Sequence, residues 1–154
     1  MTSDEDGARR PVAARRSGWA IALAAWLARR GVRPNAISVG SLIAAVVAGA
    51  CLLLAGRAEP AWRVALLILA AGLIQLRLLC NLLDGMVAIE GGLGTKRGPV
   101  FNELPDRLSD SIVLVCTGYF VGAPAWAPVL GWCAALLAVL TAYVRALAGS
   151  LGGT

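Results

Sequence analysis

The stretch CNLLDGMVAIEGGLGTKRGPVFNELPDRLSD, residues 80–110, lies between two long apolar runs. It holds five of the nine acidic residues of the 154-residue chain, namely Asp84, Glu90, Glu103, Asp106 and Asp110. Charged groups are costly inside a membrane, and there they usually face a cavity or a partner. The stretch therefore predicts a polar site where one apolar helix ends and the next begins.

The composition is typical of a membrane protein. The chain is 58% hydrophobic and only 15% charged, with a mean hydropathy of +0.74. In soluble domains, about a quarter of the residues are charged. The net charge of +5 does not indicate nucleic acid, because seven of the 14 basic residues are arginines that precede Pro34. Such a cluster is typical of a cytoplasmic membrane-surface flank, so we expect no nucleic-acid partner.

The histidine and cysteine content limits the kinds of catalytic and metal site that this chain is expected to form. The chain has no histidine, which excludes histidine-dependent triads and histidine metal sites. Its cysteines lie in or beside apolar runs without C-x-x-C spacing, and we interpret them as small buried hydrophobes. They are Cys51, Cys80, Cys116 and Cys133.

The apolar runs predict an all-α fold, a polytopic membrane helix bundle with an amino-terminal interfacial amphipathic helix. Each of four runs is near the ~20 residues that a spanning helix needs. The predicted membrane domain covers residues 17–149, and residues 1–16 are expected to form a disordered cytoplasmic tail. The predicted spans are about 37–56, 61–88, 108–121 and 126–148.

The interfacial helix is predicted at about residues 17–31. Its apolar part, SGWAIALAAWLA (17–28), would be about 18 Å long, short of a bilayer core of about 30 Å. A basic front and a short apolar middle are also typical of a signal peptide, but the following ARRGVRPN is a poor cleavage region. A helix lying in the interface, with Trp19 and Trp26 as anchors, fits better.

The basic residues predict the orientation. Seven early arginines, three basic residues of the middle loop and Arg145 place eleven basic residues on the side of the amino terminus. Two, Arg57 and Arg63, lie on the other side, and Arg77 lies within the second span. The positive-inside rule thus predicts a cytoplasmic amino terminus and a cytoplasmic acidic site. The high Ala, Gly, Leu and Arg content favours a bacterial inner membrane.

Two helix faces are predicted to carry polar side chains into the same interface, since residues three or four apart share a face. Nearby carboxylates repel each other unless a cation or a proton joins them. Oxygen ligands without histidine suit a hard ion such as Mg²⁺, Mn²⁺ or Ca²⁺, and the glycine-rich basic loop GGLGTKRG suits a phosphate. The two faces carry Arg77, Asn81, Asp84 and Ala88, and Asn102, Asp106 and Asp110.

Residues 81–89 read NLLDGMVAI, and eight residues later come Gly98, Asn102 and Asp106. This spacing resembles, without a gap, the motif of the CDP-alcohol phosphatidyltransferase family. That motif is Asp-x-x-Asp-Gly-x-x-Ala-Arg, eight residues, then Gly-x-x-x-Asp-x-x-x-Asp. The resemblance covers roughly residues 18–149, and RPNAIS (33–38) is similar to the entry of the family into its first membrane helix.

The resemblance implies an enzyme of phospholipid biosynthesis that moves a phosphatidyl-type group from a CDP-linked lipid to a polar alcohol and releases CMP. It implies Mg²⁺ or Mn²⁺ as cofactor, Asp106 as ligand and general base, the lipid bilayer as surroundings, and a homodimer. The implied metal ligands are Asn81, Asp84, Asn102 and Asp106. Contacts to the CDP moiety are implied for Gly85, Ala88 and Gly98.

The sequence departs from the family pattern in three respects. Asparagines stand at two aspartate positions, Ile89 stands at the arginine position, and four spans are predicted where the family usually has six, so the chain resembles a divergent and apparently truncated member. The four motif positions carry −2 instead of −4, which predicts weaker metal binding or a single metal. Possible compensating residues are Asp110 for charge, and Arg77, Lys96 and Arg97 for the lost phosphate contact.

Other interpretations stay open. A non-catalytic relative would keep the fold and bind nucleotide, lipid or a partner, and a small transporter subunit would explain Arg77 inside a span. Structural roles are also open: Arg77 as a partner of Asp84, Asp110 as a partner of Arg107, and Asn102 as a helix cap. The sequence does not distinguish glycerol phosphate, inositol phosphate, serine or another alcohol as acceptor.

Overall fold

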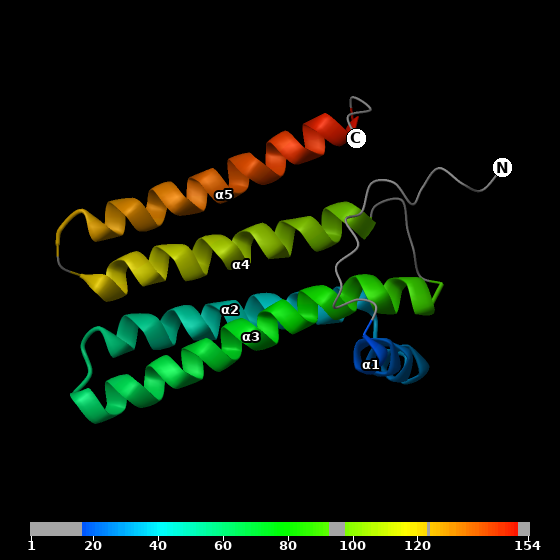
Figure 1. The fold of residues 1–154 in the computed structure, drawn as a ribbon, viewed down its shortest axis with the longest axis horizontal. Helices are drawn as coiled ribbons and strands as arrows, with labels where there is room; N and C mark the ends of the chain where they lie inside the picture. Colours follow the sequence, from blue (N-terminus) through cyan, green and yellow to red (C-terminus); the bar gives the residue numbers. More distant parts are fainter. Residues whose placement is uncertain (1–16, 93–97, 123, 151–154) are drawn as a thin grey trace.

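The structure is a computed structural model that describes residues 17–92, 98–122 and 124–150, with the backbone only at residues 90 and 98–102. These residues form helices and no strand, which confirms the predicted all-helical fold (Figure 1). The predicted tail at residues 1–16 lies outside the described residues. The helices are α1 (Gly18–Arg29), α2 (Pro34–Ala55), α3 (Pro60–Glu90), α4 (Gly98–Val121) and α5 (Ala127–Ser150).

The four long helices lie side by side along one direction (Figure 1). α2 packs extensively against both α3 and α4, whereas α3 and α4 touch each other over a short stretch only. Of the described helices, α5 packs on α4 alone. Any polar contact between α3 and α4 is therefore confined to one place along the bundle.

The helix boundaries follow from proline and glycine. Pro34 and Pro60 open α2 and α3, where a fixed φ and a missing N–H suit the first turn. Gly31, with φ of 72°, makes the turn between α1 and α2. The apolar run predicted at about 108–121 is the second part of α4, because polar residues also continue the helix back to Gly98. Hydropathy alone recognises only the apolar part of such a helix.

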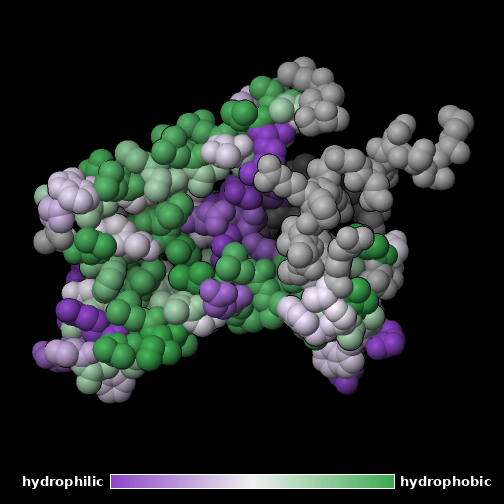
Figure 2. All heavy atoms as spheres, viewed as in Figure 1, coloured by the Kyte–Doolittle hydropathy of each residue, from purple (hydrophilic) through white to green (hydrophobic). Residues whose placement is uncertain are grey.

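Three of the described helices are long and apolar enough to cross a membrane, so the chain is an integral membrane protein. They are Pro34–Ala55, Pro60–Ile89 and Ala127–Ser150. Large apolar side chains such as Trp62 and Ile68 are about 70% exposed, at 71% and 69%, which suits a surface in contact with lipid. Figure 2 shows hydrophobic surface above and below a hydrophilic patch. A membrane crossing by α4 stays a prediction.

The short helix α1 lies across the direction of the other helices, at the end of the bundle where α3 ends (Figure 1). Ala20 and Ala24 are fully buried against a cluster that includes Leu83 and Val87 of α3. Trp19 and Trp26 are 57% and 45% exposed. One small apolar face thus packs on the bundle while two tryptophans face outward, as predicted for an interfacial helix.

Glycines bring α4 close to its neighbour α5. A Cβ on Gly118 would lie 2.8 Å from the carbonyl oxygen of Ala127, and a Cβ on Gly131 would lie 2.9 Å from that of Leu114. Small residues at helix contacts let backbones approach closely, which is a main source of helix association in membranes. These contacts fix the position of α4, and with it the side chains that α4 presents to α3.

Candidate active site

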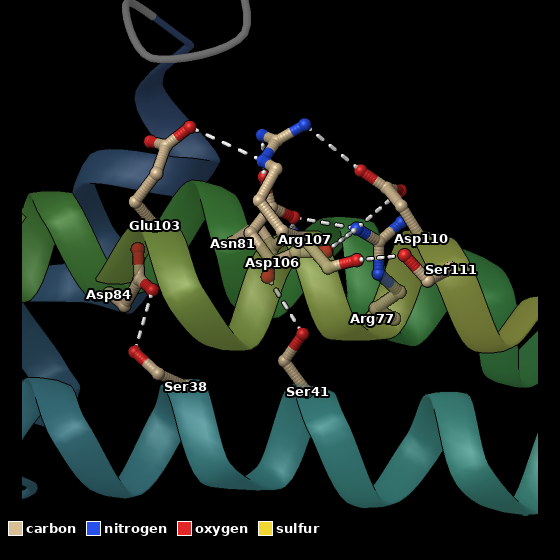
Figure 3. Close-up of polar contacts among 10 residues, drawn as sticks. All are labelled: Ser38, Ser41, Arg77, Asn81, Asp84, Glu103, Asp106, Arg107, Asp110 and Ser111. Carbon is tan, nitrogen blue, oxygen red and sulfur yellow. Dashed lines mark hydrogen bonds and ion pairs between the residues drawn. The ribbon is translucent and has the colours of Figure 1, made fainter. Parts of the chain in front are cut away.

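A buried arginine of α3 contacts two aspartates of α4 (Figure 3). Arg77 Nη2 lies 2.6 Å from Asp106 Oδ1 and 2.8 Å from Asp110 Oδ1, and the arginine side chain is only 6% exposed. Asp106 and Asp110 are four residues apart, so both point from one face of α4. One guanidinium group therefore balances two carboxylates at the point where α3 meets α4.

A second arginine, which belongs to α4 itself, also contacts Asp106 and Asp110. Arg107 contacts Asp106 Oδ2, and its Nη1 lies 3.2 Å from Asp110 Oδ2. Its Nε lies 3.2 Å from Glu103 Oε1, on a side chain that is 53% exposed. With Asp84, the described cluster has four carboxylates and two guanidinium groups, which leave a formal charge of −2.

Asn81 joins three helices. Its amide nitrogen donates to Asp106 Oδ1 on α4, and its amide oxygen accepts a hydrogen bond of 2.7 Å from Ser41 Oγ on α2 (Figure 3). The reversed amide would set its oxygen against the carboxylate oxygen of Asp106. The two neighbours therefore determine which end of the amide faces Asp106.

Asp84 is buried, with 6% exposure, and its described contacts are with α2 and with the backbone of its own helix. Its Oδ2 accepts a hydrogen bond of 2.8 Å from Ser38 Oγ of α2, and its Oδ1 accepts one of 2.6 Å from the backbone N–H of Gly85. The described contacts thus tie Asp84 to α2, whereas Asp106 is tied to Arg77, Asn81 and Arg107.

The other predicted site residues are placed in part. Gly85 and Ala88 are half-buried on α3, and Ile89, at the arginine position of the motif, is 67% exposed. Gly98 is the first residue of α4. The side chain of Asn102 lies outside the described residues, as do Lys96 and Arg97.

Oxygen donors of the kind that hard cations prefer lie on both sides of the α3–α4 contact. In residues 17–92, 98–122 and 124–150, no three His, Cys, Asp or Glu side chains form a group arranged to hold a metal ion. The motif donors on α3 are the carboxylate of Asp84 and the neutral amide oxygen of Asn81. On α4, the motif donor is the carboxylate of Asp106, which contacts both Arg77 and Arg107. The oxygen chemistry of these donors fits a hard divalent cation.

Sequence reasoning missed the two serines of α2 that contact the motif. Ser38 and Ser41 are 3% and 1% exposed and lie 46 and 40 residues from their partners in the sequence. A usable signal was present, because hydroxyls at spacing three inside an apolar helix usually face another helix. The predicted pairing of Asp110 with Arg107 is confirmed.

A separate cavity of about 400 Å³ lies away from this cluster, where α2 and α4 end. Residues such as Leu53, Arg57 and Tyr119 line it, and none of the motif residues does. The candidate site is therefore the polar cluster between α3 and α4.

Fold and cluster together define an integral membrane protein with a charged site between the apolar helix α3 and the polar first part of α4. The sequence matches the family model of CDP-alcohol phosphatidyltransferase over residues 31–152, most of the chain, so the protein belongs to the CDP-alcohol phosphatidyltransferase family. Comparison with curated proteins gives no match, and neither does comparison with solved structures. The family carries out phosphatidyl transfer in lipid biosynthesis and uses a divalent metal.

Proposed function

We propose that this chain transfers a phosphatidyl-type group from a CDP-linked lipid to a polar alcohol, with release of CMP. The observation that carries the proposal is the contact between Asn81 and Asp106, the first and last positions of the motif. They lie 25 residues apart in the sequence and meet side chain to side chain. This convergence supports a single reaction centre built from both helices.

Asp106 is the proposed general base. The alcohol oxygen forms a bond to the phosphorus of the phosphatidyl group, its proton passes to Asp106, and the bond from that phosphorus to the bridging diphosphate oxygen breaks. The electron pair of that bond leaves with CMP. Proton transfer to a positioned carboxylate typically contributes about 10²–10⁴-fold to a rate. Because Asp106 is held by Arg77 and Asn81, its orientation is fixed before substrate binds.

One Mg²⁺ or Mn²⁺ ion is the proposed cofactor. Bound at this site, such an ion would neutralise the diphosphate and stabilise the leaving oxygen. The residues proposed to hold it are Asn81, Asp84, Asn102 and Asp106, with Asp110 as a further carboxylate close by. Amide oxygens ligate hard cations without adding charge, so we expect weak binding and one occupied site.

The nucleotide is proposed to lie along the end of α3 and the start of α4. Gly85, Ala88 and Gly98 carry little or no side chain, so a ligand is able to approach the helix backbone there. With Ile89 at the arginine position, Lys96 and Arg97 are the proposed phosphate contacts. Arg77 is the weaker candidate for this role, because it is buried in ion pairs with Asp106 and Asp110.

The proposed location is a bacterial inner membrane, with the amino terminus and the site on the cytoplasmic side. The distribution of basic residues supports this orientation through the positive-inside rule. The position of α1, across the bundle end next to the motif, agrees with a site at a membrane surface. The homodimer implied by the family resemblance stays a prediction.

A non-catalytic relative is the second candidate. One observation favours it: both oxygens of Asp106 already contact cationic groups of the chain itself, Arg77 and Arg107. A carboxylate fully engaged in this way resembles a structural ion-pair network. Such a protein would bind a CDP-linked lipid without turning it over.

The test is release of CMP by the purified full chain in lipid nanodiscs, given labelled CDP-diacylglycerol, Mg²⁺ or Mn²⁺ and a panel of alcohols. We expect metal-dependent release with one acceptor class, and a loss of about 100-fold or more in Asp106→Ala. Binding of CDP-diacylglycerol without release of CMP, with every acceptor tested, would support the non-catalytic relative.

A further inference from the structure

We propose that Ser38 and Ser41 of α2 are positioning residues, which orient Asp84 and Asn81 and thereby set the affinity of the site for a divalent cation. This inference rests on the proposed function, because it concerns the same motif. It adds a third helix to a site that the motif assigns to α3 and α4 only.

The two serines match the two motif residues in spacing. Ser38 and Ser41 are three residues apart on α2, and Asn81 and Asp84 are three residues apart on α3. Successive helices run in opposite directions here, so Ser38 meets Asp84 at 2.8 Å and Ser41 meets Asn81 at 2.7 Å. Figure 3 shows both serine side chains pointing from α2 toward α3. Each motif side chain of α3 thus has its own hydroxyl.

Ser38 holds the carboxylate of Asp84. A serine hydroxyl has one hydrogen to donate. Among the described contacts of Ser38, its acceptors are Asp84 Oδ2 at 2.8 Å and the Pro34 carbonyl at 3.3 Å. The carboxylate is closer and charged, so it forms the stronger bond. A carboxylate oxygen that accepts this hydrogen bond keeps a lone pair for a cation, and the bond fixes the direction of that lone pair.

Ser41 holds the amide of Asn81. Its hydroxyl donates to Oδ1, which leaves Nδ2 of Asn81 to donate to Asp106. Without the Ser41 hydroxyl, the amide oxygen of Asn81 would lose the hydrogen-bond donor that it has on α2. A buried amide oxygen without a hydrogen bond costs free energy of folding. The side-chain amide of Asn81 would then rotate to find another donor, and its hydrogen bond to Asp106 would be lost as well. Ser41 therefore acts on α4 through Asn81.

A purely structural role makes a different prediction. Serine is common at helix contacts in membranes because it is small, and both serines are buried at the contact between α2 and α3. If size alone mattered, alanine would serve equally well at both positions. The hydroxyl-specific role predicts a loss of cation affinity that does not accompany a loss of fold.

The test is Mn²⁺ binding by the purified full chain, measured from the electron paramagnetic resonance signal of free Mn²⁺, for Ser38→Ala and Ser41→Ala. Ser109→Ala is the matched control: Ser109 is fully buried on α4, and its Oγ has no hydrogen-bond partner in the described part of the chain. Alanine keeps helix propensity and removes only the hydroxyl. Removal of such outer-shell partners typically weakens metal affinity about 10–100-fold.

We expect Mn²⁺ affinity to fall about 10-fold in Ser38→Ala and less in Ser41→Ala, whose partner is uncharged, with Ser109→Ala unchanged. In the CMP-release assay, the metal concentration at half-maximal rate should rise in both variants. At saturating metal, kcat should stay near wild type in Ser38→Ala and fall in Ser41→Ala, because Ser41 also holds Asp106 through Asn81. Unchanged Mn²⁺ affinity in both variants would overturn the inference, even if they unfold at a lower temperature. A wild-type chain that binds Mn²⁺ but releases no CMP would refute the proposed function alone, and one that binds no Mn²⁺ would overturn both.

Discussion

The two halves of α4 are held in place by different forces. The first half, from Glu103 to Asp110, contacts α3 through ion pairs with a buried arginine. The second half contacts α5 through backbone close approach at Gly118 and Gly131. The first kind of contact depends on charge, and the second depends only on the absence of side-chain atoms.

This difference separates the placement of the helix from the properties of the site. The glycine contacts hold α4 close to α5 without any charged side chain. The charged half then determines how the carboxylates of Asp106 and Asp110 are neutralised, by Arg77, by Arg107 or by a bound cation. Substitutions in the two halves should therefore change different measurable quantities.

The largest effect is expected for Arg77→Met. Removal of one partner from a buried ion pair typically costs 3–5 kcal/mol, because the other charge stays buried. Arg107 still contacts Asp106 and Asp110, so we expect a loss near the lower end, about 3 kcal/mol in the free energy of unfolding. Divalent cations should recover part of the loss, since they are able to neutralise the same carboxylates. The measurement is thermal unfolding in detergent, with and without Mg²⁺.

Arg63→Met is the control for that substitution. Arg63 is exposed and donates through Nε to the backbone carbonyl of Ala55 at 3.0 Å. We expect a small loss that does not depend on Mg²⁺. If Arg77→Met were as stable as wild type in the absence of cations, Arg107 and solvent would be sufficient to stabilise Asp106 and Asp110.

The second prediction concerns the glycine half of α4. In Gly118→Ala the new Cβ would meet the Ala127 carbonyl at 2.8 Å and the Cα of Gly131 at 3.1 Å. These are backbone atoms, so α4 and α5 have to separate, and overpacking of this kind costs about 1–3 kcal/mol. We expect lower thermal stability with unchanged Mn²⁺ affinity, because the ion pairs lie on the other half of the helix.

Gly72→Ala is the matched control, since nothing lies within 4 Å of a Cβ at Gly72 on α3. There the same change should be neutral or stabilising, by up to about 1 kcal/mol, because alanine favours the helix more than glycine does. A fall in Mn²⁺ affinity in Gly118→Ala, but not in Gly72→Ala, would mean that the two halves of α4 are coupled.

Much of the fold is readable from the sequence because its determinants are local. Apolar runs of about the right length predicted the helices, and the predicted starts at about 37 and 61 lie within three residues of the observed starts at Pro34 and Pro60. The start of α4 was placed too late by hydropathy, because residues 98–107 include four polar or charged residues and two prolines. Their helical state depends on helix propensity and tertiary contacts, which a hydropathy pattern does not contain.

The site was readable only where its members share the motif. The resemblance placed Asn81 and Asp106 together, and the structure joins them. It did not indicate that Arg77 would bind Asp106, since the partner considered for Arg77 was Asp84. Such pairings depend on the rotation of α3 and α4 about their axes, which is determined by packing against neighbouring helices and not by the local sequence. Ser38 and Ser41 were missed for the same reason.

The third prediction is that Asn81→Asp raises the affinity for Mn²⁺ roughly tenfold, a gain of about 1.4 kcal/mol. The substitution adds a negative charge next to Asp106 and removes the amide donor that now contacts it. Without a cation, two carboxylates would repel each other, so the variant should be less stable than wild type in the absence of Mn²⁺ and gain more from its addition. Binding titrations and thermal unfolding would measure both changes. A variant that loses affinity would indicate that the donated hydrogen bond to Asp106 matters more than the added charge.

The smallest effect is expected for Glu103→Gln, at the outer edge of the charged half of α4. Its carboxylate lies 3.2 Å from Arg107 Nε, but the side chain is 53% exposed. Exposed pairs contribute little, so we expect a change of no more than about 0.5 kcal/mol in the free energy of unfolding. Arg107 keeps its contacts to Asp106 and Asp110, so Mn²⁺ affinity should stay at the wild-type value. A clear fall in Mn²⁺ affinity would instead make Glu103 a cation ligand, and the site would then extend outward along α4 beyond the ion pairs with Arg77.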